Sequence, residues 1–426
     1  MKLSALTHPL RALARSSTLL ATLLVGLTLT ACGGGGGSGG TGDLAASADT
    51  GFSQGVITGF GSIIVNGVRI DDSKARISDD DDDDSPGRSS DDLRLGMVVS
   101  VSSSGTGTGT VTASAISFGS ELQGLVQSID GSTATTSTGT STVSAGTHTL
   151  TILGQTVIVG TRTIFDPRNL PGGFADIRVG NALEVHGLLD PTTNKLIASR
   201  IERKSSPNAY KITGNVASLN TGSKTFKIGS ENISYSATDS NNLRVSLTNG
   251  ITVKVRLATV QTTTGTWSAT RVKAARKALE NRNKVEVEGL ITDFTSITST
   301  FKVNGIPVQV TTTTSLPTRI TLTNGVNVEV HGRLVNGTLI ASKVKLEGKD
   351  DDSDDDRGIE LHGLISSVNA GSKTFSLRGL TVSYAGPVEY QRGTAANVVN
   401  GANVEVKGVA STTGTTVIAQ KIKFEN

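Results

Sequence analysis

The chain has 426 residues, with 40 Lys or Arg, 37 Asp or Glu, 50 Gly, 9 Pro, one Cys and 4% aromatic residues. Charges this close to balance create no strong field for nucleic acid, and a single cysteine excludes a disulfide within the chain. The many Thr, Ser, Val, Ile and Gly residues favour short strands and tight turns, so we expect an all-β protein whose units are held by their own apolar cores.

The N-terminal segment has the pattern of an export signal. The charged residues before Asp43 are Lys2, Arg11 and Arg15. An apolar run over residues 18–31 follows, which is too short to span a bilayer as a helix. Leu29-Thr30-Ala31-Cys32 resembles the lipobox of bacterial lipoproteins, where the thiol receives a diacylglycerol before cleavage. This resemblance implies a signal peptide over 1–31 and a lipidated Cys32 with palmitate-type chains. The alternative is an ordinary signal peptide that ends near a free thiol.

A flexible tether is expected after the lipidated cysteine. Residues 33–54 are rich in Gly, Ser and Ala, so 32–54 should connect the anchor to the folded part. By family resemblance, Gly33 in place of Asp implies export to the outer membrane. We therefore expect a protein held on a membrane of the cell envelope by its lipid, with an envelope protein or a glycan as a further partner.

A recurring start motif, Gly-[Leu/Val/Asn]-[Val/Ile]-x-x-apolar, divides the remaining chain into five units. The motif begins at Gly55, Gly124, Gly214, Gly289 and Gly363. A second glycine then opens an alternating strand, at Gly96, Gly180, Gly250, Gly325 and Gly401. An Ala-x-x-[Ile/Val] motif follows, at Ala113, Ala198, Ala269, Ala341 and Ala419. The fixed order predicts modules 1 to 5 over 55–118, 122–204, 209–275, 283–348 and 358–426, with an acidic insertion in module 1 and an acidic linker over 349–357.

Each module is expected to be a small β-barrel. Residues 301–310 alternate around Asn304-Gly305, a pair that suits the positive φ angles of a type I′ turn, and 63–70 repeat this around Asn66-Gly67. About five short strands in a unit of this size are most economically closed as an OB-like barrel, which removes exposed edges. A small β-sandwich is the alternative.

Helix is expected only between modules 3 and 4. Residues 272–284, with the sequence VKAARKALENRNK, are dominated by good helix formers.

The tandem modules, the lipobox and the signature VEVHG (328–332) followed by ASKV (341–344) resemble an uncharacterised domain-of-unknown-function family. This family occurs in tandem in proteobacterial lipoproteins. The resemblance covers residues 55–426 and is weakest in module 1. It implies OB-like modules and brings no established activity.

No reactive residue recurs at one module position. His186 and His331 each follow Glu-Val and precede Gly, but the matching residues elsewhere are Ser102, Arg256 and Lys407. Alternation places His186 on the same strand face as Glu184, so its side chain should point to water. A metal site built from His186, His331 and His362 would need three modules to converge. We therefore predict no catalytic residue, no cofactor and no metal site of this kind.

Two acidic runs stand apart from the modules. They are Asp79, Asp80, Asp81, Asp82, Asp83 and Asp84, and Asp350, Asp351, Asp352, Asp354, Asp355 and Asp356. Adjacent like charges repel and stay hydrated, which favours a solvated loop and a linker. Weak Ca²⁺ binding is the sharper interpretation, although neither run has the spacing of a high-affinity calcium loop.

Repetition without a distinctive residue favours a non-catalytic, lipid-anchored string of separate modules with a structural or adhesive role. The alternative is an array that binds oligosaccharide or cell-wall polymer, which should expose aromatics such as Trp267 or Tyr384. Nucleic-acid binding is not expected, because Phe226, Phe301 and Phe375 recur at a hairpin position typical of a core. A hydrolase is the remaining class, and no motif marks one.

Overall fold

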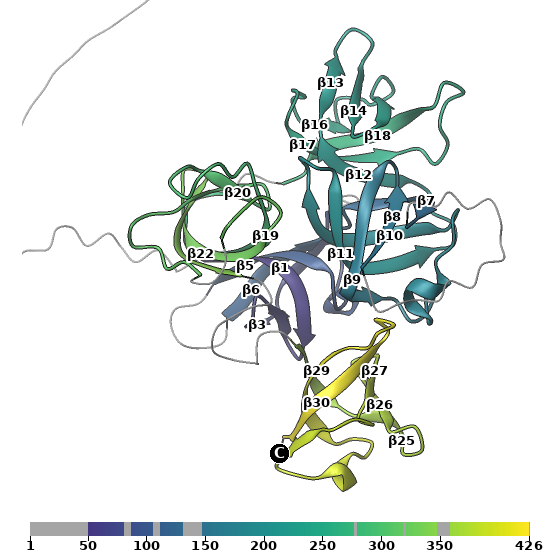
Figure 1. Cartoon of the computed structure of the whole chain (residues 1–426), viewed down its shortest axis with the longest axis vertical. Helices are drawn as coiled ribbons and strands as arrows, with labels where there is room; N and C mark the ends of the chain where they lie inside the picture. Colours follow the sequence, from purple (N-terminus) through teal and green to yellow (C-terminus); the bar gives the residue numbers. More distant parts are fainter. Residues whose placement is uncertain are drawn as a thin grey trace, which may run out of the picture. The chain divides into compact units, whose positions relative to one another are not determined.

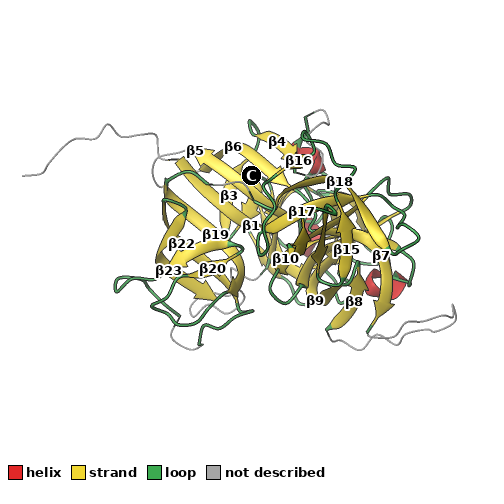
Figure 2. Cartoon of the chain, turned by 90° about the horizontal axis from the view of Figure 1, so that it is seen from above, coloured by secondary structure: helices red, strands yellow, loops and turns green. Residues whose placement is uncertain are grey.

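The computed structural model describes residues 50–80, 87–104, 111–130, 147–276, 279–317, 321–346 and 358–425. The chain divides into two units, Met1–Ala45 and Ala46–Asn426, and every described residue belongs to the second unit. The signal peptide and Cys32 lie outside the described residues. Strands make up nearly all of the regular structure in the described ranges (Figure 2). Among these residues, no helix has the length and apolar character to cross a membrane.

Module 4 shows the arrangement that the modules share. Its strands are β19 (Arg282–Thr292), β20 (Phe301–Val303), β21 (Ile306–Gln309), β22 (Asn327–Val335) and β23 (Thr338–Leu346). β19 pairs with β20 and β22, β20 pairs with β21, and β23 pairs with β21 and β22. The pairs therefore close a five-stranded ring, visible around β19, β20 and β22 in Figure 1. This OB-like barrel confirms the predicted fold over the alternative of a sandwich.

The other modules repeat this ring with small additions. Module 1 has β1 (Thr50–Phe60), β2 (Ile63–Val65), β3 (Val68–Asp71), β4 (Arg76–Asp79), β5 (Val98–Ser104) and β6 (Val111–Phe118). The tether predicted over 32–54 is therefore wrong for residues 50–54, which pair within β1 and belong to module 1. Module 2 has β7 (Leu122–Ile129), β8 (His148–Ile152), β9 (Gln155–Phe165), β10 (Ala182–Asp190) and β11 (Lys195–Lys204). Short 3-10 helices lie at Ser90–Asp92, Gly173–Asp176 and Ala395–Asn397.

In modules 3 and 5 the first strand continues, after one residue, as a second short strand. Module 3 has β12 (Tyr210–Asn215), β13 (Ala217–Asn220), β14 (Thr225–Ile228), β15 (Glu231–Ser234), β16 (Leu243–Arg244), β17 (Thr252–Leu257) and β18 (Thr266–Ala274). Module 5 has β24 (Ile359–Leu364), β25 (Ser366–Asn369), β26 (Thr374–Leu377), β27 (Leu380–Ser383), β28 (Glu389–Gln391), β29 (Asn403–Ala410) and β30 (Thr416–Phe424).

Three strands of each barrel are hydrogen-bonded neighbours. The first strands are β1, β7, β12, β19 and β24, the fourth strands are β5, β10, β17, β22 and β29, and the fifth strands are β6, β11, β18, β23 and β30. The fourth strand lies between the first and the fifth in every module.

The glycines of the repeat hold the first and fourth strands together. The glycine before each fourth strand has φ between 84° and 89°, a conformation that favours glycine. Its N–H donates to the carbonyl of the third residue of the start motif at 2.8 to 2.9 Å. The five pairs are Gly96–Ile57, Gly180–Val126, Gly250–Val216, Gly325–Ile291 and Gly401–Ile365. The predicted hairpin turn is also confirmed, because φ is 50° at Asn304 and 76° at Gly305.

The apolar core lies inside the barrels. Phe226, Phe301 and Phe375 are 1%, 0% and 1% exposed, as predicted for core residues. Modules 2 and 3 share one cluster of buried apolar side chains that extends from Leu122 to Val272. Modules 1, 4 and 5 are each built around a cluster that is largely their own.

The predicted helix over residues 272–284 is wrong for the part that the structure describes. Val272 and Lys273 belong to β18 and pair with β17 and β16, and Arg282 and Lys284 belong to β19. Backbone pairing with neighbouring strands outweighs the helix propensity of this segment, which is a weak preference.

Modules also pair with each other through their first strands. Gly51–Gln54 of β1 pair in parallel with Lys284–Val287 of β19. The far end of β1 pairs with β24, and β12 pairs with β7 at Lys211 and Ile212. The sequence predicts separate modules that close individually, whereas these ladders join modules 1, 4 and 5 and modules 2 and 3.

Candidate functional site: the charged face of the first, fourth and fifth strands

The first, fourth and fifth strands carry polar side chains on the face opposite the core, which we call the charged face. On each fourth strand two such positions flank a fully buried valine. The pairs are Ser100 and Ser102, Glu184 and His186, Lys254 and Arg256, Glu329 and His331, and Glu405 and Lys407. Alternation along a strand places both members of each pair on one side.

A β-bulge follows the second of these positions in all five modules. The register shifts between Ser102 and Ser103, His186 and Gly187, Arg256 and Leu257, His331 and Gly332, and Lys407 and Gly408. At Gly187, Gly332 and Gly408 an added Cβ would lie 2.1 to 2.2 Å from a carbonyl oxygen of the fifth strand. Because a bulge re-aims the side chain beside it, the fold fixes the direction of this residue in each module.

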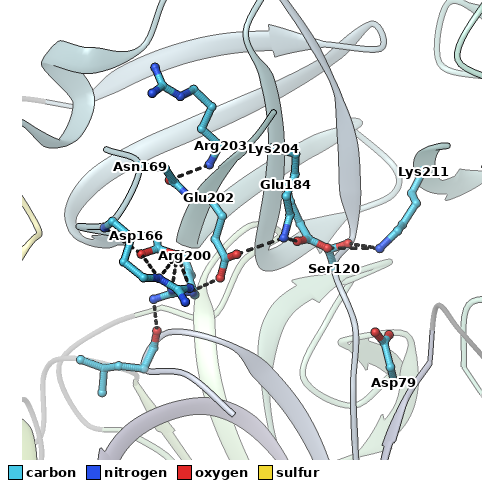
Figure 3. A network of polar contacts seen from close by, with 12 residues as sticks. Asp79, Ser120, Asp166, Asn169, Glu184, Arg200, Glu202, Arg203, Lys204 and Lys211 are labelled. Atoms are coloured by element: carbon cyan, nitrogen blue, oxygen red, sulfur yellow. Dashed lines mark hydrogen bonds and ion pairs between the residues drawn. The ribbon is translucent and has the colours of Figure 1, made fainter. Parts of the chain in front are cut away.

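In module 2 the charged face is a chain of alternating charges (Figure 3). Arg200 Nε donates to Glu202 Oε1 at 2.7 Å, and Arg200 Nη2 lies 3.5 Å from Asp166 Oδ2. Lys204 Nζ donates to Glu202 Oε2 at 3.1 Å and also contacts Glu184. The side chains of Asp166, Arg200 and Glu202 are 2%, 3% and 9% exposed, so most of this chain of charges is buried.

The same chain of charges reaches the neighbouring modules. Lys211 of module 3 donates from Nζ to Glu184 Oε1 at 3.1 Å. Arg200 donates from Nη1 to the carbonyl of Leu95 in module 1 at 3.2 Å. Burial alone would raise the pKa of Glu184, but Lys211, His186 and Lys204 outweigh it and hold that pKa well below the ordinary value.

His186 is buried, which corrects the prediction that it points to water. Only 2% of the residue is exposed, and its Nδ1 lies 3.2 Å from the carbonyl oxygen of Gly119. The prediction failed because it used the face of the strand and not what covers that face. Burial lowers the pKa of His186, and the nearby carboxylates of Glu184 and Glu202 only partly oppose this effect.

Module 4 gathers carboxylates on the same face. Across the first and fourth strands, Glu286 pairs with His331 and Glu288 pairs with Glu329. His331 Nε2 lies 2.6 Å from Glu329 Oε1, and His331 Nδ1 lies 3.6 Å from Glu286 Oε1. The nearest lysine contacts are longer, at 3.7 Å for Lys345 with Glu329 and 3.9 Å for Lys284 with Glu286.

These carboxylates change the protonation of module 4. Burial alone would lower the pKa of His331, but the carboxylates of Glu286 and Glu329 outweigh it and raise that pKa to about 9. Burial also opposes ionisation of Glu286, yet His331 lowers its pKa. Glu288 has its pKa raised by burial, and it accepts hydrogen bonds from Val56 N at 3.0 Å and Asn327 Nδ2 at 3.2 Å.

Module 5 has glutamates at the positions that match Glu286 and Glu329, but its histidine lies on the first strand and not on the fourth. Glu360 pairs with Lys407, and His362 pairs with Glu405. His362 Nε2 and Glu360 Oε1 share a hydrogen bond of 2.6 Å, and Lys423 Nζ donates to Glu405 Oε2 at 2.6 Å. Each carboxylate of this cluster therefore already has a close partner.

The structure also places the other residues that the sequence singled out. Among the described residues, the groups with metal-ligand spacing contain one histidine each, so His186, His331 and His362 do not form a shared site. Asp79 accepts a hydrogen bond from Arg88 at 3.2 Å. Asp80 directly follows β4, and its N–H donates to Phe118 O at 2.6 Å. The other aspartates of both runs, Asp81 to Asp84 and Asp350 to Asp356, lie outside the described residues.

The aromatic residues expected on a glycan-binding face lie inward. Trp267 is 8% exposed, and its Nε1 donates to Glu231 Oε2 at 2.7 Å. Tyr384 is half-buried and its ring lies 5.8 Å from that of Phe375. Over the described ranges, the exposed large hydrophobic residues are all aliphatic. The expectation of an exposed Trp267 is therefore wrong.

Comparisons with known proteins agree with a repeated domain without assigned function. Residues 123–202, 288–345 and 362–423 match a family described as Domain of unknown function (DUF5666). These segments fall in modules 2, 4 and 5 and confirm the predicted likeness to a repeated domain of unknown function. No curated protein matches the chain.

Two solved structures show a distant likeness. Drosophila Unr CSD456 is 14% identical over 54% of this chain and 98% of its own, with a TM-score of 0.14. A multidomain protein with nucleic acid binding domains from Streptococcus pneumoniae is 11% identical over 54% of this chain and 74% of its own, with a TM-score of 0.15. Superpositions this weak carry no argument about what the chain binds.

Proposed function

We propose that this chain, three segments of which match a domain of unknown function, is a non-catalytic, lipid-anchored protein of the cell envelope with a structural or adhesive role. The supporting observation is that module 2 uses its charged side chains to bind its neighbours. Arg200 contacts module 1 and Glu184 contacts module 3, so the groups that could act on a substrate are bound within the protein.

The pairing of first strands supports the same role. A ladder of four residue pairs joins β1 to β19, and Ser53 of module 1 donates from Oγ to Glu286 Oε2 of module 4 at 3.4 Å. Backbone ladders together with side-chain contacts resist separation of modules more than a flexible linker does. Coupled modules suit a protein that transmits force or presents a fixed surface.

The alternative of an oligosaccharide-binding array loses its predicted feature. Stacking on a sugar ring or a base needs an accessible aromatic face. Trp267 is instead packed edge-on against Tyr210, with ring centroids 5.7 Å apart, and its indole N–H is bound to Glu231. A glycan array probed with the full chain should therefore show no specific binding, and binding lost in Trp267→Ala would contradict the proposal.

The lipid anchor is tested separately from the modules. Cells of a lipoprotein-producing bacterium that express the full chain are grown with radiolabelled palmitate and fractionated. The chain should carry label and sediment with the outer membrane, whereas Cys32→Ser should carry no label and remain soluble. Equal fractionation of the two proteins, or an unlabelled chain, would overturn the anchored role. A matched control is Ser38→Ala in the tether, which leaves Cys32 in place.

A further inference from the structure

We propose that Glu286, Glu329 and His331 of module 4 form a binding site for a divalent first-row transition ion of the Zn²⁺ class. One ligand atom from each residue lies within 4.8 Å of those of the other two. The residues come from two paired strands, Glu286 from β19 and the other two from β22. Because these strands are fixed by backbone pairing and by the bulge after His331, the three side chains converge without a flexible loop.

The geometry needs only small side-chain movements to hold an ion. Ligands at about 2.1 Å from a tetrahedral Zn²⁺ lie about 3.4 Å from each other. The ligand atoms of the cluster lie within 4.8 Å of one another, and Glu329 Oε1 lies 2.6 Å from His331 Nε2. Rotation of the glutamate side chains would widen this shortest spacing and narrow the longer ones. Three protein ligands leave a fourth position for water, which is a common arrangement around Zn²⁺.

The two candidate ligand atoms that lie closest together are Glu329 Oε1 and His331 Nε2. Glu329 is only 6% exposed, and the two atoms form an ion pair 2.6 Å apart. A divalent ion would replace the proton of His331 Nε2 and bind both atoms from one position.

The two competing lysines are distant from the carboxylates, and one of them is largely exposed. Lys345 Nζ lies 3.7 Å from Glu329, and Lys284 Nζ lies 3.9 Å from Glu286, both near the limit for an ion pair. The Lys284 side chain is 62% exposed, so it can move into solvent when an ion binds. Glu288 is already occupied by its two hydrogen bonds and is not needed as a ligand.

The mixed donor set selects the class of ion. An imidazole nitrogen suits Zn²⁺ and its neighbours in the first transition row, whereas Ca²⁺ and Mg²⁺ take oxygen ligands almost exclusively. Two carboxylates and one imidazole therefore favour Zn²⁺ over the calcium that acidic runs would bind.

Module 5 shows why the proposal is confined to module 4. Glu360, His362 and Glu405 also have metal-ligand spacing. There, however, Glu360 shares a 2.6 Å hydrogen bond with His362, and Glu405 binds Lys423 at 2.6 Å. The contact between His362 and Glu360 matches the one between His331 and Glu329, so the modules differ in the lysine contact. An ion in module 5 would have to displace Lys423 from Glu405, whereas Lys345 of module 4 lies 3.7 Å from Glu329. Module 5 should therefore bind Zn²⁺ more weakly.

The test is calorimetric titration of Zn²⁺ into the full chain after chelator treatment, with Cys32→Ser in every sample to remove the thiol. A single Zn²⁺ per chain should bind, and His331→Gln and Glu329→Gln should each weaken binding by at least about tenfold. Two matched controls, His362→Gln in module 5 and His148→Gln in module 2, should change affinity by less than about twofold. Equal binding by His331→Gln and the parent, or no binding by the parent, would overturn the proposal.

X-ray absorption at the zinc edge keeps the proposal testable where a variant fails to fold. The zinc-loaded parent chain should show one imidazole and otherwise oxygen ligands. A signal from two or more imidazoles, or from none, would overturn the assignment to module 4.

Discussion

Modules 2 and 4 carry a histidine at the same position of the fourth strand, but the surrounding charges differ. His186 on the fourth strand pairs with Arg200 on the fifth strand, and cations and carboxylates alternate along that face. His331 on the fourth strand pairs with Glu286 on the first strand, and Glu329 lies on the same strand as His331. The pKa of the first histidine is lowered, and the pKa of the second is raised to about 9.

This difference shows how one fold supports two kinds of site. The bulge fixes where the side chains point, and the residues on neighbouring strands decide what neutralises them. In module 2 the protein supplies its own cations from the fifth strand and from module 3. In module 4 the carboxylates are neutralised by a proton on His331 or, as proposed above, by a metal ion.

The largest expected effect comes from removing the central cation of module 2. Arg200→Met leaves Asp166 and Glu202 buried without their shared partner, although Arg168 and Lys204 still contact them. The free energy of unfolding should fall by about 3 kcal/mol, as measured by urea denaturation. The control is Arg203→Met on the same strand, where the residue is exposed and the loss should stay below about 0.5 kcal/mol. Equal losses would mean that the buried chain of charges does not stabilise module 2.

The next effect is a pH dependence of opposite sign in the two modules. The pKa of His331 is raised from 6.5 to about 9, so its contribution to stability is complete below pH 6.5 and is lost as the pH rises through 9. The groups that face it are Glu286 on β19, Glu329 on β22 and Lys343, its partner on β23. Denaturation of chelator-treated protein should show a loss on the order of 2 kcal/mol over this range.

His331→Gln should remove that alkaline loss, and a loss that persists in the variant would assign it to another group.

His186 should change the stability with pH in the opposite direction. Its pKa is lowered from 6.5, so the folded state resists its protonation and loses stability as the pH falls below 6.5. The groups facing His186 are Glu184, Glu202, Arg200 and Lys211.

A smaller effect is expected at the contact between modules 2 and 3. Lys211→Met removes the hydrogen bonds to Glu184 and Ser120 but leaves Lys204 beside Glu184. The free energy of unfolding should fall by about 1 to 2 kcal/mol. The exposed Lys195 serves as the control in Lys195→Met, where no measurable change is expected. A Lys211→Met variant as stable as this control would argue against coupling through the charged face.

The smallest expected effect concerns the single tryptophan. Trp267→Phe loses the hydrogen bond to Glu231 and should cost about 1 kcal/mol. Because Trp267 is the only tryptophan and is 8% exposed, its fluorescence should be blue-shifted and weakly quenched by iodide. Strong quenching would place the indole on the surface and restore the glycan-binding alternative.

Much of the fold could be predicted from the sequence because its signals are local. The Asn304-Gly305 pair adopts the expected positive φ angles, and the glycine before each fourth strand, such as Gly325, recurs with one conformation. Alternating apolar residues around these turns fix five strands and their order. The segment 272–284 was the exception, since strand pairing with β17 and with neighbours along the chain overrides helix propensity there.

The charged face was only partly predictable. Alternation correctly places Glu184 beside His186, but burial of that face depends on contacts with other modules, which no local pattern encodes. The useful signal was the polar residue two positions before the residue that precedes each bulge, at Ser100, Glu184, Lys254, Glu329 and Glu405. Comparing residue types at that position, in place of searching for one invariant histidine, would have found the charged face.

The most direct measurement is an NMR titration of the histidine side chains in the chelator-treated full chain, with His186→Gln and His331→Gln to assign the signals. If the charged faces are buried and paired within the protein, His331 should titrate near pH 9 and His186 below pH 6.5. If both titrate near 6.5, the faces are open to water and the account of coupled, internally neutralised modules is contradicted.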